Sequence, residues 1–364
     1  MLVNKKTENF KYSLILCFIL SMVSVYVIPR AEEYSNFSIY FDSLIAVIYF
    51  LIFTVNYSIK NTKFNVEYSI LLFSIFLLPF GSKIFNVHWI YILLFSIISF
   101  SKIKIPKNLQ YFSIFFLLII ITFQLLTYSS YDGRPTLSFG DPNYTAYYLT
   151  ILFFLFQSFG ITRFCYIFLL LATLTISRVF FISVFIYIIL NIFNNFKFTK
   201  TINFFAKISP FIVVFAPIIY SYFYLILIGD PTINYQSGYE RLLDINDKSN
   251  SDRALANLYY IDYLIENPLH IITGVDFYTY VPEIFYNTPH NSLMATSFNY
   301  GILYFLAALS IFCKTYIFSR KTVSINIFIL SMLPWMIFLG GVFFGPQLII
   351  IGFIINNLNS DDNN

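Results

Sequence analysis

The chain has 364 residues, of which 58% are hydrophobic and only 11% are charged, and its formal net charge is +4. Soluble globular domains are about a quarter charged, so this composition excludes a soluble enzyme, a secreted domain and a disordered protein. The mean hydropathy of +0.74 suits a chain that lies in a lipid bilayer. Because a chain in lipid must pair its backbone polar groups internally, we expect an all-α polytopic membrane protein.

Apolar segments of roughly membrane-spanning character follow one another along the sequence. They predict about 12 transmembrane helices within a single membrane domain over residues 1–364. The first segment follows Lys5, Lys6 and Lys11 as a signal peptide would, but no small-x-small cleavage site follows it, so we interpret it as a retained helix. The predicted segments are 12–29, 39–56, 67–81, 86–100, 111–127, 144–160, 164–177, 179–195, 208–228, 292–313, 323–340 and 342–357.

The lysines and arginines predict which ends of these helices face the cytoplasm. If the N-terminus is cytoplasmic and the helices alternate, 15 of the 22 Lys and Arg residues fall on the cytoplasmic side and seven on the outer side. Cytoplasmic loops of membrane proteins carry an excess of Lys and Arg. We therefore expect both termini in the cytoplasm.

Two polar segments fall on the outer side under this orientation. Residues 128–143 form a short extracytoplasmic loop, and residues 229–291 form a large one that carries nine acidic residues. A structureless connection of that length would be unusual. We expect the large loop to contain short helices and part of a functional site.

His290 is the first candidate for chemistry, in the string TPHNSLMATSFNYG. Thr288 is a suitable N-cap and Pro289 suits the first helical position, so His290 would lie in the first turn of a helix. A helix N-terminus disfavours the imidazolium form, and a neutral imidazole can accept a proton. The alternative is an interfacial histidine hydrogen-bonded to the loop. His88 and His270 have plainer interpretations as an interfacial anchor and a helix-end residue.

Arg253 lies in SDRALANLYYIDYLIENPL, where apolar residues recur at three- and four-residue spacing. This pattern predicts a short amphipathic helix capped by Ser251 or Asp252 and ended by Asn267-Pro268, with Arg253 in its first turn. A cation there opposes the helix dipole, so local structure does not favour it. Arg253 is either salt-bridged to a loop acid or a fork-shaped donor for phosphate oxygens.

Two more arginines fall on the outer side. Arg178, in TISRVFF, stands between two apolar segments and needs an anion, a water-filled cavity or a snorkelling path. Arg134 opens RPTLSFGDPN, in which Asp141 can cap the next helix, Pro142 can begin it and Asn143 falls in its first turn. A turn-rich connector is the alternative for this segment. Three arginines at one membrane edge could hold a lipid diphosphate, and a neutral histidine could deprotonate an acceptor hydroxyl.

Other chemistries lack their sequence patterns. The chain contains no GxxxxGK[ST], HExxH, CxxC or GxSxG motif, and its three cysteines are far apart. The acidic residues of the large loop have no EF-hand spacing, so a metal is not indicated. Basic residues near aromatic ones are better explained by membrane orientation than by binding to nucleic acid.

These residues resemble a known family of bacterial membrane proteins. HNSLMATSFNYG is similar to the H-N-x-x-L-(x6)-G signature of the O-antigen ligase and O-antigen polymerase superfamily. RPTLSFGDPNYTA resembles its R-x-(x)-G-x-F-x-(x)-P-N segment, TISRVF resembles its T-x-S-R-G pattern, and Arg253 followed by ENPLHIITGV resembles an arginine followed by N-P-L-x-G-x-G. All four stretches occur in the order of the family, over nearly half of the chain.

The resemblance implies a GT-C-like glycosyltransferase of the bacterial inner membrane. Such an enzyme takes a sugar chain from undecaprenyl diphosphate on the outer face, with inversion and without a metal or nucleotide sugar. The resemblance gives His290 the role of general base, and it gives Arg253 and Arg178, with Arg134 as a weaker candidate, the role of binding the diphosphate. Arg253 and Arg178 would also stabilise the charge that develops on the leaving group, and Arg253 is counted with His290 as catalytic. Asn143 and Asn291 would orient substrate.

The resemblance does not separate two activities. A polymerase would join lipid-linked oligosaccharide repeat units for O-antigen or capsule, and we favour it because the aromatic-rich composition suits enzymes that differ with each glycan. A ligase would transfer the finished glycan to lipid A–core or another acceptor. The expected partners are the lipid-linked oligosaccharide, a glycan acceptor and the bilayer, with a chain-length regulator as a further candidate. A flippase of lipid-linked sugars is the alternative from another class, but such transporters usually have polar or broken helices near the midplane.

Overall fold

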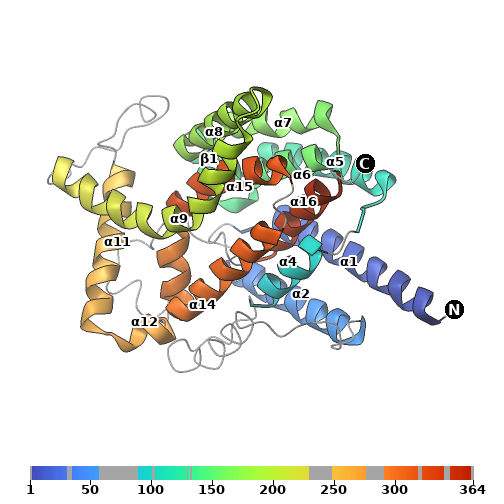
Figure 1. Ribbon diagram of the computed structural model, residues 1–364, viewed down its shortest axis with the longest axis horizontal. Helices are drawn as coiled ribbons and strands as arrows, with labels where there is room; N and C mark the ends of the chain where they lie inside the picture. Colours follow the sequence, from blue (N-terminus) through green and yellow to red (C-terminus); the bar gives the residue numbers. More distant parts are fainter. Residues whose placement is uncertain are drawn as a thin grey trace.

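The computed structural model of the chain describes residues 2–30, 35–56, 89–100, 103–128, 130–131, 133–228, 248–275, 291–318, 322–339 and 345–361. Within these ranges the chain is helical apart from connecting turns and one very short hairpin (Figure 1). The elements up to the hairpin and the turn after it are α1 (Leu2–Tyr26), α2 (Ser35–Asn56), α4 (Trp89–Phe100), α5 (Lys107–Thr127), β1 (Ser130–Tyr131), β2 (Arg134–Pro135) and the 3-10 turn η3 (Leu137–Phe139). The rest are α6 (Pro142–Ser158), α7 (Thr162–Thr173), α8 (Arg178–Asn195), α9 (Thr199–Ile228), α11 (Lys248–Glu266), α12 (Leu269–Thr273), α14 (Ser292–Phe318), α15 (Val323–Phe338) and α16 (Gln347–Asp361).

The helices confirm the prediction of an all-α membrane protein. Every predicted apolar segment except 67–81, which lies outside the described residues, coincides with a helix in its described part. By length and apolar character, four described helices could cross a membrane: Lys107–Thr127, Arg178–Asn195, Thr199–Tyr224 and Ser292–Ser310. Six shorter apolar helices accompany them. The count of 12 spans stays a prediction.

Burial separates central helices from peripheral ones. Nearly every residue of α6, α15 and α16 is buried, as expected for helices that are apolar on all sides and surrounded by others. In contrast, α5 buries one stripe and exposes large side chains such as Phe115, Phe123 and Leu126. An exposed apolar face of this size would be unstable in water but suits contact with lipid.

Polar contacts join the helix ends in the way that alternating helices require. At one end, the Ser292 hydroxyl at the start of α14 donates to the carbonyl of Leu339 just after α15, at 3.2 Å. At the opposite end, the Asn356 amide of α16 donates to the carbonyl of Ile103, at 2.5 Å. The start of α14 and the end of α15 therefore belong to one end of the bundle, called here the outer end because the lysine and arginine pattern predicts it to face outward. The same pattern predicts that the starts of α6 and α8 lie at this end.

A buried ion pair fastens α1 and α2 near the outer end. The guanidinium of Arg30 donates to both carboxylate oxygens of Asp42, at 3.0 and 3.1 Å. Burial lowers the pKa of Arg30, but the charge and hydrogen bonds of Asp42, together with nearby Tyr148 and Tyr91, outweigh it, so its pKa lies above the ordinary value. The backbone N–H of Arg30 also donates to the carbonyl of Ser138 at 2.6 Å, which holds the segment of β2 and η3 against α1.

Helix α9 is longer than predicted and contains two prolines, Pro210 and Pro217. Proline has no N–H, so Pro210 leaves the carbonyl of Ala206 without its helical donor. The hydroxyl of Ser209 donates to that carbonyl instead, at 2.9 Å.

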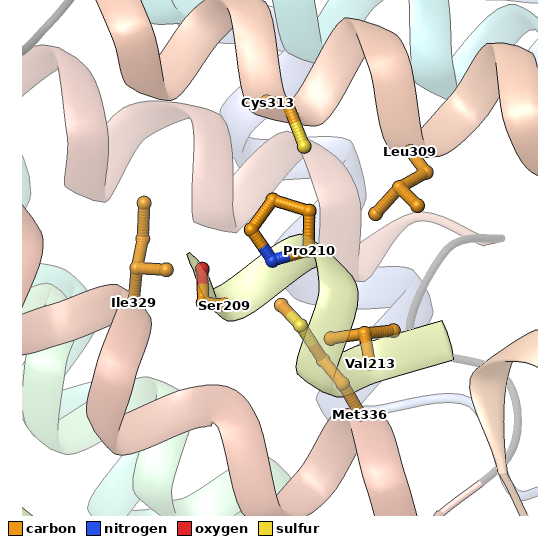
Figure 2. A pocket seen from close by; sticks show the side chains of 7 residues that line it. All are labelled: Ser209, Pro210, Val213, Leu309, Cys313, Ile329 and Met336. Atoms are coloured by element: carbon orange, nitrogen blue, oxygen red, sulfur yellow. The ribbon is translucent and has the colours of Figure 1, made fainter. Parts of the chain in front are cut away.

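A small pocket lies beside this turn, between α9, α14 and α15, and Figure 2 shows its mainly apolar lining. The cavity volume open to the centre of a water molecule is about 10 Å³, so the pocket holds at most one water.

Candidate functional site

Arg134 lies in the hairpin that precedes α6. It pairs with Tyr131 across the hairpin, and its guanidinium carbon lies 5.8 Å from the centre of the Tyr131 ring. Gly133, at φ 71°, makes the turn between the two short strands. Arg134 is only 2% exposed, so the hairpin holds a cation in a largely dehydrated position. A buried cation is costly unless anionic or polar groups compensate it.

The start of α6 has the predicted geometry. The carboxylate of Asp141 caps the helix by accepting from the backbone N–H groups of Asn143, at 2.6 Å, and Tyr144, at 3.2 Å. Pro142 is the first helical residue, and Asn143 lies in the first turn. The hydroxyl of Thr145 donates to the carbonyl of Thr136, which attaches the turn after Arg134 to the same helix start.

Arg178 and Asn143 are brought together by Ser177, which the sequence motifs did not indicate as part of a site. The hydroxyl of Ser177, at the N-cap position of α8, donates to the side-chain oxygen of Asn143 at 3.0 Å. Arg178 is the first residue of α8 and is partly buried. The helix starts that carry Asn143 and Arg178 are therefore neighbours, although 35 positions separate the two residues in the sequence.

Arg253 reaches the same region from α11. It interacts electrostatically with the hydroxyl of Tyr144 in the first turn of α6. The predicted cap at Ser251 or Asp252 is wrong, because α11 already begins at Lys248 and no proline or glycine interrupts its first residues. Arg253 thus lies in the second turn, where a cation opposes the helix dipole less than it would in the first.

Asn291 caps α14, and a chain of amides ties it to α11. Its side-chain oxygen accepts from the backbone N–H of Met294 at 2.8 Å, which is the N-cap pattern. Its side-chain nitrogen donates to the oxygen of Asn257 at 2.8 Å, and the Asn257 nitrogen donates to the hydroxyl of Ser221 in α9 at 2.9 Å. Asn257 lies one helical turn after Arg253, so one face of α11 carries the arginine and holds the start of α14.

The predicted base lies outside the described residues. This applies to His290 and also to Thr288 and Pro289, which we expected to begin its helix. In the part of the chain that the structure describes, that helix begins at Ser292 and its cap is Asn291. His88, too, lies outside the described residues, and His270 is held by the hydroxyl of Tyr263, whose oxygen lies 2.7 Å from its Nδ1.

The contacts that join the site come from residues whose roles were not evident from the sequence. Asn257 could have been found, since it follows Arg253 by one turn on the predicted helix. Ser177 could also have been suspected, because serine is a common N-cap and Arg178 follows it. Ser221 and Tyr144 give no signal in a chain with 30 tyrosines and many serines.

The arrangement favours an anionic ligand at the outer end. The starts of α6 and α8 lie together. At α6 the Asp141 carboxylate already accepts from the backbone N–H groups of Asn143 and Tyr144, so the backbone donors that could attract a phosphate group are those at the start of α8. Arg178 begins one of these helices, and the charge of Arg253 acts on Tyr144 in the first turn of the other. Among the described residues, no three His, Cys, Asp or Glu side chains are grouped as a metal site would require.

Comparisons with known proteins give no match: no family model, no curated protein and no solved structure resembles the chain significantly.

Proposed function

We propose that the chain is a membrane glycosyltransferase that joins oligosaccharide repeat units carried on undecaprenyl diphosphate, at the outer face of a bacterial inner membrane. The proposal is supported by the resemblance of four motifs to the O-antigen ligase and polymerase superfamily. One observation carries it: the described parts of these motifs, far apart in the sequence, meet at one end of the helical bundle. Asn143 contacts the residue before Arg178, Arg253 acts on Tyr144, and Asn291 is bound to the helix of Arg253.

In the proposed reaction His290 acts as the base and the three arginines bind the leaving group. His290 accepts the proton of the acceptor hydroxyl, and the hydroxyl oxygen forms a bond to the anomeric carbon of the donor sugar. The bond between that carbon and the diphosphate oxygen breaks, with inversion, and undecaprenyl diphosphate leaves. Arg178 and Arg253, supported by Arg134, bind the diphosphate and stabilise the charge that grows on it. A positioned base contributes roughly 10²–10⁴-fold to such a reaction.

The positions of the arginines suit this substrate. The diphosphate of a membrane lipid stays at the interface while its prenyl chain remains in the bilayer, so the anion must be bound at a helix end. Guanidinium groups match phosphate oxygens with two parallel hydrogen bonds, which lysine cannot reproduce. The three arginines of the proposed site lie in different elements: Arg134 in the hairpin before α6, Arg178 at the first position of α8 and Arg253 in the second turn of α11.

The test is the glycan profile of a strain that lacks the gene, complemented with wild type, His290→Ala or His270→Ala. His270 is the matched control, because it belongs to the same large loop and its ring is already bonded to Tyr263. We expect a normal ladder from wild type and from His270→Ala, and a single repeat unit on the acceptor from His290→Ala. Long lipid-linked polymer without transfer would assign a ligase instead. A wild-type ladder from His290→Ala would remove the histidine from the mechanism and favour a transporter.

A further inference from the structure

Two glycines from distant segments contact each other through their backbones. Gly274 follows α12, and Gly301 interrupts α14, where its φ of 79° and ψ of 161° are not helical. A Cβ atom at Gly301 would lie 1.9 Å from the carbonyl oxygen of Ile272, and a Cβ atom at Gly274 would lie 2.9 Å from the backbone nitrogen of Gly301. Only glycine fits at either position without displacing main chain.

A hydrogen bond beside the glycines fixes the contact. The backbone N–H of Val275 donates to the carbonyl of Phe298 at 2.7 Å, so the end of α12 pairs with the last turn of α14 before its break. Both glycines have positive φ, of 74° and 79°, a conformation that other residues adopt only with strain. Glycine is therefore required at both positions for two reasons: the backbones approach too closely for a Cβ atom, and φ is positive.

The contact holds one end of a short helical segment, residues 292–300, whose other end is held by Asn291. Between these two points, Tyr260 of α11 donates to the hydroxyl of Ser297 at 3.3 Å, and its ring lies 5.0 Å from that of Phe298. Figure 1 shows α11 and α12 lying beside this outer part of α14. The segment is thus bound along its length to the helix that carries Arg253.

We infer that Gly301 and Gly274 are positioning residues for the proposed glycosyl transfer. Their contact places the first turns of α14 against α11, and this fixes Asn291, the neighbour of His290 in the sequence, relative to Arg253. The inference rests on the proposed function. In that reaction a base acts on the acceptor oxygen, which bonds to the anomeric carbon, while an arginine binds the diphosphate oxygen that leaves the same carbon. A displacement of about 1 Å between such groups can cost about 10²-fold in rate.

The test compares Gly301→Ala with Gly160→Ala. Gly160 also has a positive φ, of 77°, but a Cβ atom there would meet nothing within 4 Å. Both substitutions add the strain of alanine at positive φ, and only Gly301→Ala adds a collision with backbone. Gly274→Ala is the milder variant at the same contact, because its closest approaches are 2.9 and 3.0 Å.

The purified proteins are assayed in liposomes with a lipid-linked repeat unit, and hydrogen exchange is measured on the peptide that contains Val275. We expect kcat to fall about 10²-fold in Gly301→Ala and less in Gly274→Ala, with KM near wild type, while Gly160→Ala keeps kcat within about threefold. Exchange at Val275 should become faster in Gly301→Ala, because the bond to Phe298 is lost with the contact, and should stay as slow as in wild type in Gly160→Ala.

Equal kcat in Gly301→Ala and Gly160→Ala would overturn the positioning role. So would a loss of activity in Gly301→Ala while the Val275 peptide exchanges as slowly as in wild type. Should Gly301→Ala not fold, the same comparison between Gly274→Ala and Gly160→Ala decides. If wild type transfers no sugar at all, the proposed function fails, and the exchange experiment still decides whether the glycine contact holds the segment.

Discussion

Helix α9 lacks a helical hydrogen bond at Pro210 and helix α14 is broken at Gly301, and the two irregularities are stabilised in different ways. At Pro210 the lost helical bond is replaced by the neighbouring Ser209 hydroxyl, and the surroundings are apolar side chains around a pocket for at most one water. At Gly301 the backbone of another segment fills the break, because Ile272 and Gly274 approach within the space that a Cβ atom would need.

The irregularity at Pro210 is local to one helix, whereas the break at Gly301 is a contact between several segments. The turn at Pro210 depends on residues of its own helix, so the effect of a change there should stay local. The break at Gly301 depends on α12 and, through the same short segment, on α11, so a change there should reach Arg253. Contacts between distant segments occur at both ends of the bundle, and at the outer end they include the Asn257–Asn291 pair.

The largest loss of stability is expected from breaking the outer-end ion pair. Arg30→Leu leaves the carboxylate of Asp42 buried without its guanidinium, which should lower stability by about 3–5 kcal/mol. The exposed Arg163 is the control, and Arg163→Leu should change little. Thermal unfolding in detergent measures both. The double variant Arg30→Leu/Asp42→Leu should recover part of the loss, because it no longer buries an unpaired carboxylate. A double variant less stable than Arg30→Leu would show that the unpaired Asp42 carboxylate does not cause the loss.

An intermediate effect is expected at Asn257. Asn257→Ala removes the partner of Asn291 and of Ser221, at a cost of about 1–3 kcal/mol for buried groups left unpaired, and should also lower turnover. Thermal unfolding and kcat measure the two effects. Asn191→Ala is the matched control, because Asn191 donates to the carbonyl of Tyr187 in its own helix, at 2.7 Å. Equal turnover in the two variants would separate Asn257 from the site.

A double-mutant cycle tests whether Asn257 and Gly301 act on turnover through the same segment. Both residues hold residues 292–300, so the losses in turnover of Asn257→Ala and Gly301→Ala should not add in the double variant. Additive losses, measured as kcat for the four proteins of the cycle, would mean that the segment is not held as one unit.

The smallest effect is expected at the turn of α9. Ser209→Ala leaves the carbonyl of Ala206 without its donor and should cost about 1 kcal/mol in thermal unfolding. In a Pro210→Ala background the same substitution should cost almost nothing, because the alanine that replaces the proline would supply the helical N–H. Turnover should match wild type in both single variants and in the double variant. A loss of activity in Ser209→Ala would mean that this region, too, is linked to the site.

Much of the fold could be predicted from the sequence because the lipid environment imposes a simple pattern. Long apolar runs must become helices in a bilayer, and the cap at Asp141-Pro142 follows from local side-chain chemistry. The starts of α1 and α9 were predicted too late, since the lysines before each apolar run were interpreted as loop residues. Long lysine side chains can extend from the end of a helix to the interface, so their charge does not mark a helix boundary.

The site was predictable as a set of residues but not as a network. Motifs selected three arginines and two asparagines, and the described structure brings Asn143 to Arg178 through Ser177 and Asn291 to Arg253 through α11. Ser177, Asn257 and the two glycines at 274 and 301 make these connections. Their contacts are between segments far apart in the sequence, and no local pattern encodes which serine or asparagine will meet which partner.

The most direct measurement of the central claim uses the purified chain in liposomes that contain an oligosaccharide repeat unit on undecaprenyl diphosphate. Product length and free undecaprenyl diphosphate are measured together, for wild type and for His290→Ala. The proposal predicts that wild type makes a ladder of longer lipid-linked glycans and releases one undecaprenyl diphosphate for each unit added, while His290→Ala does neither. A wild-type protein that moves the donor across the membrane without changing its length would contradict it.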